Sequence, residues 1–159
     1  DGEYYPLDFH WSQLCLNSLI KRLNLRTNKD FFPLGYVDDQ IVLSLIKNAY
    51  ALIMPSLSEG GGSYPVEEAL TVGTPVLCSD IPVMREHLNN RTAKIGWFDP
   101  LSVDSIIMAV DDLIKHYDVY KKSTVNGMKD KRPSWEFIAN RYIDIFEKVI
   151  QEHRDKSIN

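Results

Sequence analysis

The sequence predicts an α/β fold, a doubly wound parallel sheet with helices on both of its faces. Short apolar segments alternate over most of the 159 residues with longer segments whose apolar residues recur at helical spacing. The central apolar segment, Ala51-Leu52-Ile53-Met54, shows no alternation and stops at Pro55, as expected of a strand buried on both faces of a parallel sheet. The length suits one domain with a sizeable core, so residues 1–159 are interpreted as a single domain.

Three elements are expected before that strand. Apolar residues recur at helical spacing from Asp8 to about Asn24 and predict a helix. Phe31-Phe32-Pro33-Leu34-Gly35 is typical of a short strand that ends in a turn. Asp38 or Asp39 can cap the next helix. The core face expected for that helix consists of Ile41, Leu45, Ile46 and Ala49.

A run of three glycines, Gly60 to Gly62, follows the central strand. Each glycine costs chain entropy on folding, so a turn that only reverses direction would be better served by one. Pro65 suits the first turn of a helix, and Glu67 and Glu68 then lie where negative charge is favoured. Ligands of open α/β sheets bind beyond the carboxyl ends of the strands, where the N-terminus of the next helix offers unpaired N–H groups. We therefore expect a ligand to approach the backbone of this glycine loop closely.

The next helix, strand and helix follow without a long loop. Gly73 is expected to end the helix that begins at Pro65, and residues 75–79 form a strand. A short helix then begins near Pro82, with Ser79 or Asp80 as its cap.

The segment Arg85-Glu86-His87 lies in this short helix and suggests two interpretations. It could carry acid–base chemistry, but we favour a solvated helix face. Residues 93–98 form a further strand, closed by Asp99-Pro100. Ser102 is expected to cap the following helix. The buried stripe predicted for that helix consists of Val103, Ile106, Ile107, Val110, Leu113 and Ile114.

The last part of the chain is expected to be helical. Residues 118–131 are polar and predict a partly exposed helix. Ser134 is expected to cap a final amphipathic helix, and the charged residues 151–159 to form a frayed tail. The apolar side chains of the final helix are Trp135, Ile138, Tyr142, Ile145, Phe146 and Val149.

Composition and charge exclude several classes of function. The net charge of −4 and the scattered basic residues argue against a nucleic-acid partner. No apolar run approaches the roughly 20 residues that span a bilayer, and no signal segment opens the sequence, so a cytoplasmic protein is expected. Neither Cys15 nor Cys78 has a partner at metal-ligand spacing, and no metal is expected.

A motif of glutamates around the glycine loop resembles a known family. Glu59, the glycines, Pro65, Glu68-Ala69 and Gly73-Thr74-Pro75-Val76 follow one another as in the C-terminal, donor-binding lobe of retaining glycosyltransferases with the two-lobed GT-B fold. These belong to glycosyltransferase family four, also called glycosyl transferases group 1. Two glutamates separated by seven residues mark that family. Glu59 and Glu67 have this spacing, but Glu68-Ala69 matches the Glu-Ala that closes the motif, which implies one residue inserted in the loop.

The resemblance implies a role for each of these residues. Glu59 would contact the hydroxyls of the donor sugar and Glu68 the ribose, as the two catalytic residues, with Glu67 as the alternative to Glu68. The turn at Tyr36-Val37 would face the nucleotide base, although a hydrophobic hinge is an equally good interpretation of Val37. The residues implied in donor binding are Gly60, Gly61, Gly62, Ser63, Tyr64, Pro65, Glu67 and Val37.

The resemblance also implies an activity and its partners. A nucleotide sugar such as GDP-mannose or a UDP-sugar would be the donor, and a polysaccharide or lipid-linked glycan the acceptor, with no cofactor. The complete enzyme would be cytoplasmic or peripheral at the inner membrane face. We expect the first two strands of the lobe and the N-terminal lobe to be missing from these 159 residues, so that this fragment alone would be inactive and would tend to self-associate.

Two other functions remain as alternatives. A non-catalytic nucleotide-binding or partner-binding module would show the same fold, because the basic residues that clamp the diphosphate in the family would lie in the missing strands. A dinucleotide oxidoreductase is disfavoured, since no Gly-x-Gly-x-x-Gly opens a strand–helix unit.

Overall fold

The computed structural model describes residues 18–130 and 133–158. Within them, three parallel strands form one sheet in the order β1 (Leu52–Met54), β2 (Val76–Ser79) and β3 (Ile95–Phe98). Helix α3 (Tyr64–Val72) connects β1 to β2, and helix α4 (Pro82–Leu88) connects β2 to β3. Because each crossover returns the chain to the same end of the sheet, the carboxyl ends of all three strands meet at one edge.

Four further helices surround or extend this unit. They are α2 (Asp39–Asn48), α5 (Val103–Lys115), α6 (Tyr117–Gly127) and α7 (Trp135–Ile158). Residues 18–22 are also helical, but the greater part of the helix expected from Asp8 to Asn24 lies outside the described residues.

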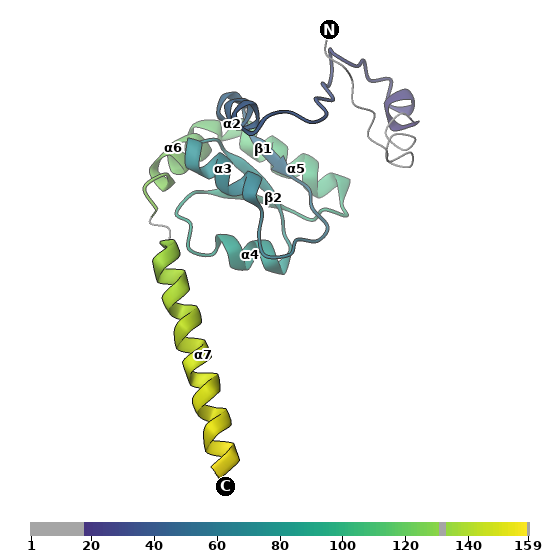
Figure 1. The fold of residues 1–159 in the computed structure, drawn as a ribbon. Coiled ribbons are helices and arrows are strands. Elements are labelled where there is room, and N and C mark those ends of the chain that lie inside the picture. Colours follow the sequence, from purple (N-terminus) through teal and green to yellow (C-terminus); the bar gives the residue numbers. More distant parts are fainter. Residues whose placement is uncertain (1–17, 131–132, 159) are drawn as a thin grey trace.

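Side chains of β2 alternate between two hydrophobic cores, one on each face of the sheet. Val76 and Cys78 pack in the core under α2, α3 and α4, whereas Leu77 packs with Phe98 in the core under α5 and α6. Helices α3 and α5 accordingly lie on opposite faces of the sheet (Figure 1). The predicted doubly wound parallel sheet is therefore confirmed.

Local signals at the helix ends were predicted correctly in most cases. Asp38, Ser102 and Ser134 each accept a hydrogen bond from a backbone N–H two or three residues later, at 2.9, 3.2 and 3.1 Å. Gly73 ends α3 in the left-handed conformation, with a φ of 77°, where glycine carries no steric penalty.

The predicted cap of α4 is wrong. Ile81 occupies the capping position and makes no side-chain bond to the helix. Asp80 binds Arg85 instead, at 2.6 and 2.7 Å, so its carboxylate is directed to a side chain rather than to the backbone. This guanidinium holds the pKa of Asp80 below its usual value.

The strand predicted over residues 31–35 is also wrong. Phe31 makes only an isolated bridge with Thr27, and no described strand lies beside it. An extended segment becomes a strand only when a neighbour accepts its hydrogen bonds, and none of the described segments does so. Strand β1 is consequently the edge of the described sheet, and Ile53 is 45% exposed rather than buried on both faces.

The core face of α2 differs from the prediction in part. Ile46 is buried as expected, and Val42 packs beside it, but Ile41 and Leu45 are exposed. Helix α2 packs mainly on α3, so only the stripe that faces α3 is covered.

The stripe of α5 shows the same effect. Leu113 is buried as predicted, together with Ala109, and Ile106 and Val110 pack against them. Three residues of the predicted stripe are exposed because α5 contacts β3 and α6 over a narrower band than its apolar surface, namely Val103, Ile107 and Ile114.

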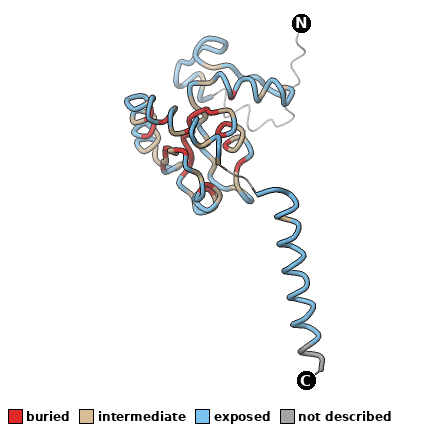
Figure 2. Tube along the Cα trace, turned by 90° about the vertical axis from the view of Figure 1, so that its left-hand side faces the viewer, coloured by how far each residue is buried: buried red, intermediate tan, exposed pale blue. Residues whose placement is uncertain are grey.

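Helix α7 extends away from the rest of the domain (Figure 1), and almost all its described side chains are exposed (Figure 2). Helix α7 continues through Ile158. The fraying expected for residues 151–159 stays a prediction. Among the described residues, no helix combines the length and apolar character that crossing a membrane requires.

Candidate functional site

The candidate site lies where the chain leaves the carboxyl end of β1. Ser79 donates a hydrogen bond to the carbonyl oxygen of Met54 at 3.1 Å and so ties the ends of β1 and β2 together. The following loop carries Glu59, which is half-buried and accepts a hydrogen bond from the hydroxyl of Ser56 at 2.6 Å. This bond holds one carboxylate oxygen of Glu59 near the edge of the sheet where ligands of such folds bind.

A hollow of about 380 Å³ opens between the glycine loop, the N-terminus of α3 and α4. It brings together five of the predicted donor-binding residues and one unexpected residue, His87. Pro65 occupies the first turn of α3 as predicted, and Gly60 is exposed on the loop beside the hollow. The lining residues are Gly61, Gly62, Ser63, Tyr64, Glu67 and His87.

Ser63 lines this hollow and carries a buried polar atom without a described partner. The residue holds the capping position of α3 and is 2% exposed, yet its hydroxyl makes no capping bond. Its Oγ has no hydrogen-bond partner among the described residues. A buried hydroxyl without a partner is costly, so a ligand or a water that completes its bonding is favoured there.

The three glycines of the loop serve different purposes. A Cβ added at Gly60 or Gly61 would meet no atom within 4 Å, so both leave open space at the surface. Gly62 has a φ of 118°, and a Cβ there would overlap the imidazole of His87. The packing and backbone conformation of the protein therefore require glycine at position 62, whether or not a ligand approaches the backbone there.

Glu67 is bonded within the protein. Arg91 donates from Nη2 to both carboxylate oxygens at 2.8 and 2.9 Å, and the two side chains are only 15% and 13% exposed respectively. Nε2 of His87 lies 3.1 Å from Oε1 of Glu67. That distance suits an ion pair, but the angles do not make a hydrogen bond, which leaves Nε2 without such a partner among residues 18–130 and 133–158.

Glu68 has a different environment from its neighbour. Successive residues of a helix point about 100° apart, so the two glutamates cannot share one set of contacts. Glu68 is half-buried, and its side chain makes no hydrogen bond or ion pair with any other described residue. Its carboxylate is the one of the two whose acceptor positions are not used by described protein groups.

Three predicted binding residues do not line this hollow: Gly60 and Pro65 adjoin its lining residues in the chain, whereas Val37 lies elsewhere, before α2. It is half-buried and directly precedes Asp38, the cap of α2. It does not line the hollow at α3.

His87 lines the site, although a solvated helix face was the interpretation favoured from the sequence. Arg85 and Glu86 are exposed, as expected for a solvated face, but the side chain of His87 is 25% exposed and faces Glu67 and Gly62. No local signal could have shown this, because the contacts join α4 to segments about 20 residues earlier in the chain. Arg85 instead stacks on Trp97, with its guanidinium carbon 4.0 Å from the ring centre.

Cys78 lies at the end of β2 close to the site but is chemically unreactive. Burial, reinforced by the negative charge of Glu59, raises the pKa of its thiol to about 11. The thiol is therefore neutral near pH 7 and is not a nucleophile there. No group of three or more His, Cys, Asp or Glu that could hold a metal ion occurs in the part of the chain that the structure describes.

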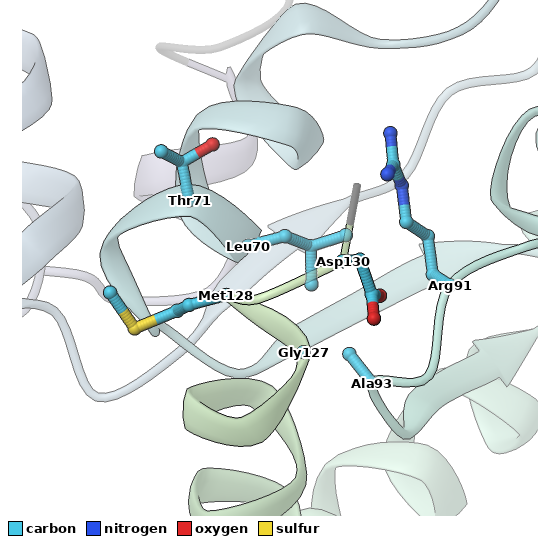
Figure 3. A pocket seen from close by; sticks show the side chains of 7 residues that line it. All are labelled: Leu70, Thr71, Arg91, Ala93, Gly127, Met128 and Asp130. Atoms are coloured by element: carbon cyan, nitrogen blue, oxygen red, sulfur yellow. The ribbon is translucent and has the colours of Figure 1, made fainter. Parts of the chain in front are cut away.

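A second hollow, of about 340 Å³, lies beside the C-terminal half of α3 and the end of α6 (Figure 3). Arg91 lines it but turns its guanidinium away from Asp130, consistent with its bonds to Glu67 (Figure 3). Asp130 accepts hydrogen bonds from the backbone and hydroxyl of Thr92 at 2.8 and 2.7 Å. Neither Glu59 nor Glu68, the two predicted catalytic residues, lines this second hollow, and neither lines the hollow at the N-terminus of α3.

The fold and the site together define a class of protein. A doubly wound parallel sheet with a glycine loop and a helix N-terminus at its carboxyl edge is the arrangement of α/β domains that bind nucleotides and other phosphate-bearing ligands. Residues 13–130 match the family of glycosyl transferases group 1, and this chain belongs to that family. The resemblance noted in the motif around Glu59 is confirmed.

Two relatives and one solved structure illustrate the similarity. An O-antigen chain mannosyltransferase of Salmonella typhimurium is 36% identical over 126 residues, which are 77% of this chain and 35% of the relative. An uncharacterized glycosyltransferase of Methanocaldococcus jannaschii is 28% identical over 138 residues, 86% of this chain and 34% of the relative. A sucrose-phosphate synthase from Thermosynechococcus elongatus superposes with a TM-score of 0.68 at 17% identity, over 89% of this chain and 35% of that one.

These comparisons also identify the fold and show how much of each relative the chain matches. The structural similarity identifies the sheet and its helices as the Rossmann-like half of a GT-B fold. The chain spans about a third of the length of the relatives it matches.

Proposed function

We propose that this chain forms the donor-binding part of a glycosyltransferase and that the hollow at the N-terminus of α3 receives a nucleotide sugar. The observation that carries the proposal is the buried hydroxyl of Ser63, which lacks a described partner beside the open glycine loop and a helix N-terminus. Membership of the glycosyl transferases group 1 supports the choice of ligand.

The N-terminus of α3 would bind the anionic part of the donor. Backbone N–H groups of the glycine loop and the positive end of the helix favour a diphosphate, and Gly60 and Gly61 leave open space for its approach. The same groups would stabilise the nucleoside diphosphate as it leaves. Preorganised donors of this kind can serve without a metal ion, so the proposal requires none.

The two catalytic glutamates would bind hydroxyl groups. Glu59, which Ser56 holds by one oxygen, would accept a hydrogen bond from the donor sugar, and Glu68 from the ribose. Hydrogen bonds to a carboxylate contribute about 1.5 to 3 kcal/mol each, so both are expected to matter for the rate. Retention of anomeric configuration forms part of the proposal through the motif that Glu59 and Glu68 share with retaining enzymes.

Relatives guide the choice of substrates to test. Besides the Salmonella typhimurium protein, an O-antigen chain mannosyltransferase of Escherichia coli is 29% identical over 115 residues. We therefore propose GDP-mannose as the first donor to test and UDP-sugars as the second, with a polysaccharide or lipid-linked glycan as acceptor. Such acceptors favour a protein that works in the cytoplasm or at the inner membrane face.

The test compares three glutamine variants in the complete protein. Glu59→Gln and Glu68→Gln are expected to lower kcat/KM by about 10- to 100-fold because each loses a charged acceptor, with little change in melting temperature. Glu67→Gln is expected to lower the melting temperature instead, because it weakens the bonds that neutralise Arg91. Released nucleotide measures the rate, and the anomer of the product shows whether configuration is retained.

The outcomes separate the assignments. Rates near wild type for both Glu59→Gln and Glu68→Gln would show that neither residue acts on the donor. Loss of activity in Glu67→Gln alone, without loss of stability, would transfer the ribose role to Glu67. A complete protein that binds nucleotide sugars but transfers none would support a non-catalytic binding module.

A further inference from the structure

His87 occupies a position that charge pairing does not explain. The carboxylate of Glu67 is already neutralised by three hydrogen bonds from Arg91, so a second basic group adds little to the balance of charge. Yet His87 packs its ring into the same cluster, with Nε2 3.1 Å from Glu67. Its contact on the other side is the glycine loop.

The ring of His87 fills the space beside Gly62 that a side chain would occupy. The three atoms nearest to a Cβ built on Gly62 all belong to this imidazole. Gly62 can accept the ring so closely because it has no side chain, and its φ of 118° is one that glycine adopts without strain. The imidazole therefore packs directly against Gly62, the last glycine of the loop.

The first two glycines of the loop have no such packing contact. Neither Gly60 nor Gly61 has an atom within 4 Å of the position of a Cβ, and glycine has more conformational freedom than any other residue. Their N–H groups are those proposed to meet the donor. The orientation of these groups then depends on how Gly62 and Ser63 anchor the end of the loop.

We propose that His87 is a positioning residue that holds the glycine loop in the conformation required for donor binding, with Glu67 and Arg91 holding His87 in turn. The proposal rests on the proposed function, because it assumes that the loop binds a nucleotide sugar. The cluster joins three segments, since Glu67 comes from α3, His87 from α4 and Arg91 from the connection to β3. It thereby fixes α4 relative to the loop.

The experiment uses the complete protein with two substitutions at His87 and one control. His87→Ala removes the ring, whereas His87→Phe keeps a ring against Gly62 but removes the nitrogens. His116→Ala is the matched control, because Nδ1 of His116 also lies 2.9 Å from a carboxylate, that of Asp112, but the residue does not line the hollow.

Two measurements are made on each variant. Hydrogen exchange of the backbone amides of residues 59–63, without ligand, reports the order of the loop independently of activity. Steady-state kinetics with the nucleotide sugar report KM and kcat separately. For His87→Ala we expect faster exchange in the loop and a rise of about tenfold in donor KM, because misplaced binding groups weaken donor binding. We expect kcat to stay within about twofold and His116→Ala to change neither property. His87→Phe should restore both properties in part, because it keeps the ring against Gly62 but loses the contact with Glu67.

A double substitution distinguishes direct contact between Gly62 and His87 from a general loss of stability. Gly62→Ala places a methyl group against the imidazole in the wild-type background, but only the backbone strain remains when His87→Ala is also present. The rise in donor KM caused by Gly62→Ala should therefore be smaller in the His87→Ala background. Strictly additive effects would show that the two residues act separately.

Other results would overturn the proposal. Unchanged exchange in the loop of His87→Ala would show that the ring does not hold it, and faster exchange with an unchanged KM would show that its order does not matter for the donor. A fall in kcat at constant KM would mean that His87 acts on the reaction itself. If wild-type protein neither binds nor converts a nucleotide sugar, the proposed function fails, and the exchange measurement alone then decides whether His87 holds the loop.

Discussion

At the scale of single residues, two adjacent glutamates differ in what they can do. Arg91 binds both oxygens of Glu67, whereas Glu68 has no bonded partner among the described residues. A shift of one position in a helix turns a side chain by about 100°, and Glu67 accordingly lines the hollow at α3 whereas Glu68 does not. The one-residue insertion that the motif implies in the glycine loop therefore decides whether Glu67 or Glu68 corresponds to the second glutamate of the family.

Neighbouring glycines are predicted to respond differently to valine. Gly61→Val should weaken nucleotide-sugar binding and leave the melting temperature almost unchanged, because its side chain would project into open space at the hollow. Gly62→Val should lower the melting temperature as well, because a β-branched residue at a φ of 118° is strained and would collide with His87. Calorimetric titration with GDP-mannose and differential scanning calorimetry measure the two effects.

Gly60→Val tests the same point at the neighbouring glycine, since a side chain there also meets no atom within 4 Å, and it too should weaken binding at an almost unchanged melting temperature. Equal binding by Gly61→Val and wild type would show that the donor does not approach this part of the loop. An unchanged melting temperature for Gly62→Val would contradict the tight packing inferred against His87.

At the scale of elements, the final helix and the first strand both carry apolar surface that the described domain does not cover. Ile53 on β1 is 45% exposed, and α7 exposes apolar side chains from Trp135 to Ile150. The exposed large apolar residues of α7 are Trp135, Phe137, Tyr142, Ile143, Ile145, Phe146, Val149 and Ile150. Exposed apolar surface of this extent favours association.

We predict that residues 1–159, produced alone, self-associate through α7. Replacing Ile145 and Phe146 together by glutamate should shift the protein toward monomers, because charged side chains would then lie on the apolar face. Light scattering over a range of concentrations measures the mass. Asn140→Glu, an equally exposed polar position on α7, is the control and should leave the association unchanged. A monomer at all concentrations for the unsubstituted chain would contradict the prediction.

At the scale of the whole molecule, the candidate site occupies one edge of one sheet. The hollow is lined from a single side by the loop after β1, α3 and α4. Sites of GT-B enzymes lie in a cleft between two lobes, as the resemblance implies, and this chain matches about a third of the length of its relatives.

We therefore predict that residues 1–159 alone bind a nucleotide sugar weakly and transfer none. One wall of a site can supply some contacts to the donor, but acceptor binding and the exclusion of water need the opposite wall. Titration with GDP-mannose and UDP-sugars measures binding, and released nucleotide measures turnover, with the complete protein as the positive control. Turnover by the 159 residues at the rate of the complete protein would overturn this prediction.

Features that depend on neighbouring residues could be predicted from the sequence alone. The capping roles of Asp38, Ser102 and Ser134 follow from a side chain that reaches a backbone group two or three positions away. Pro65 and Gly73 likewise mark the ends of α3 through their own backbone preferences. The alternation of apolar strands and helices predicted a doubly wound parallel sheet.

Only the tertiary structure decided the features that depend on which segments meet. Phe31 belongs to no strand because, within the described residues, it forms only an isolated bridge with Thr27, and Ile41 is exposed because α3 covers the neighbouring stripe of α2. His87 enters the site because the short helix α4 brings it against Gly62 and Glu67, which are about 20 residues away in the chain. Such contacts are set by packing between distant elements, and a local pattern of residue types carries no record of them.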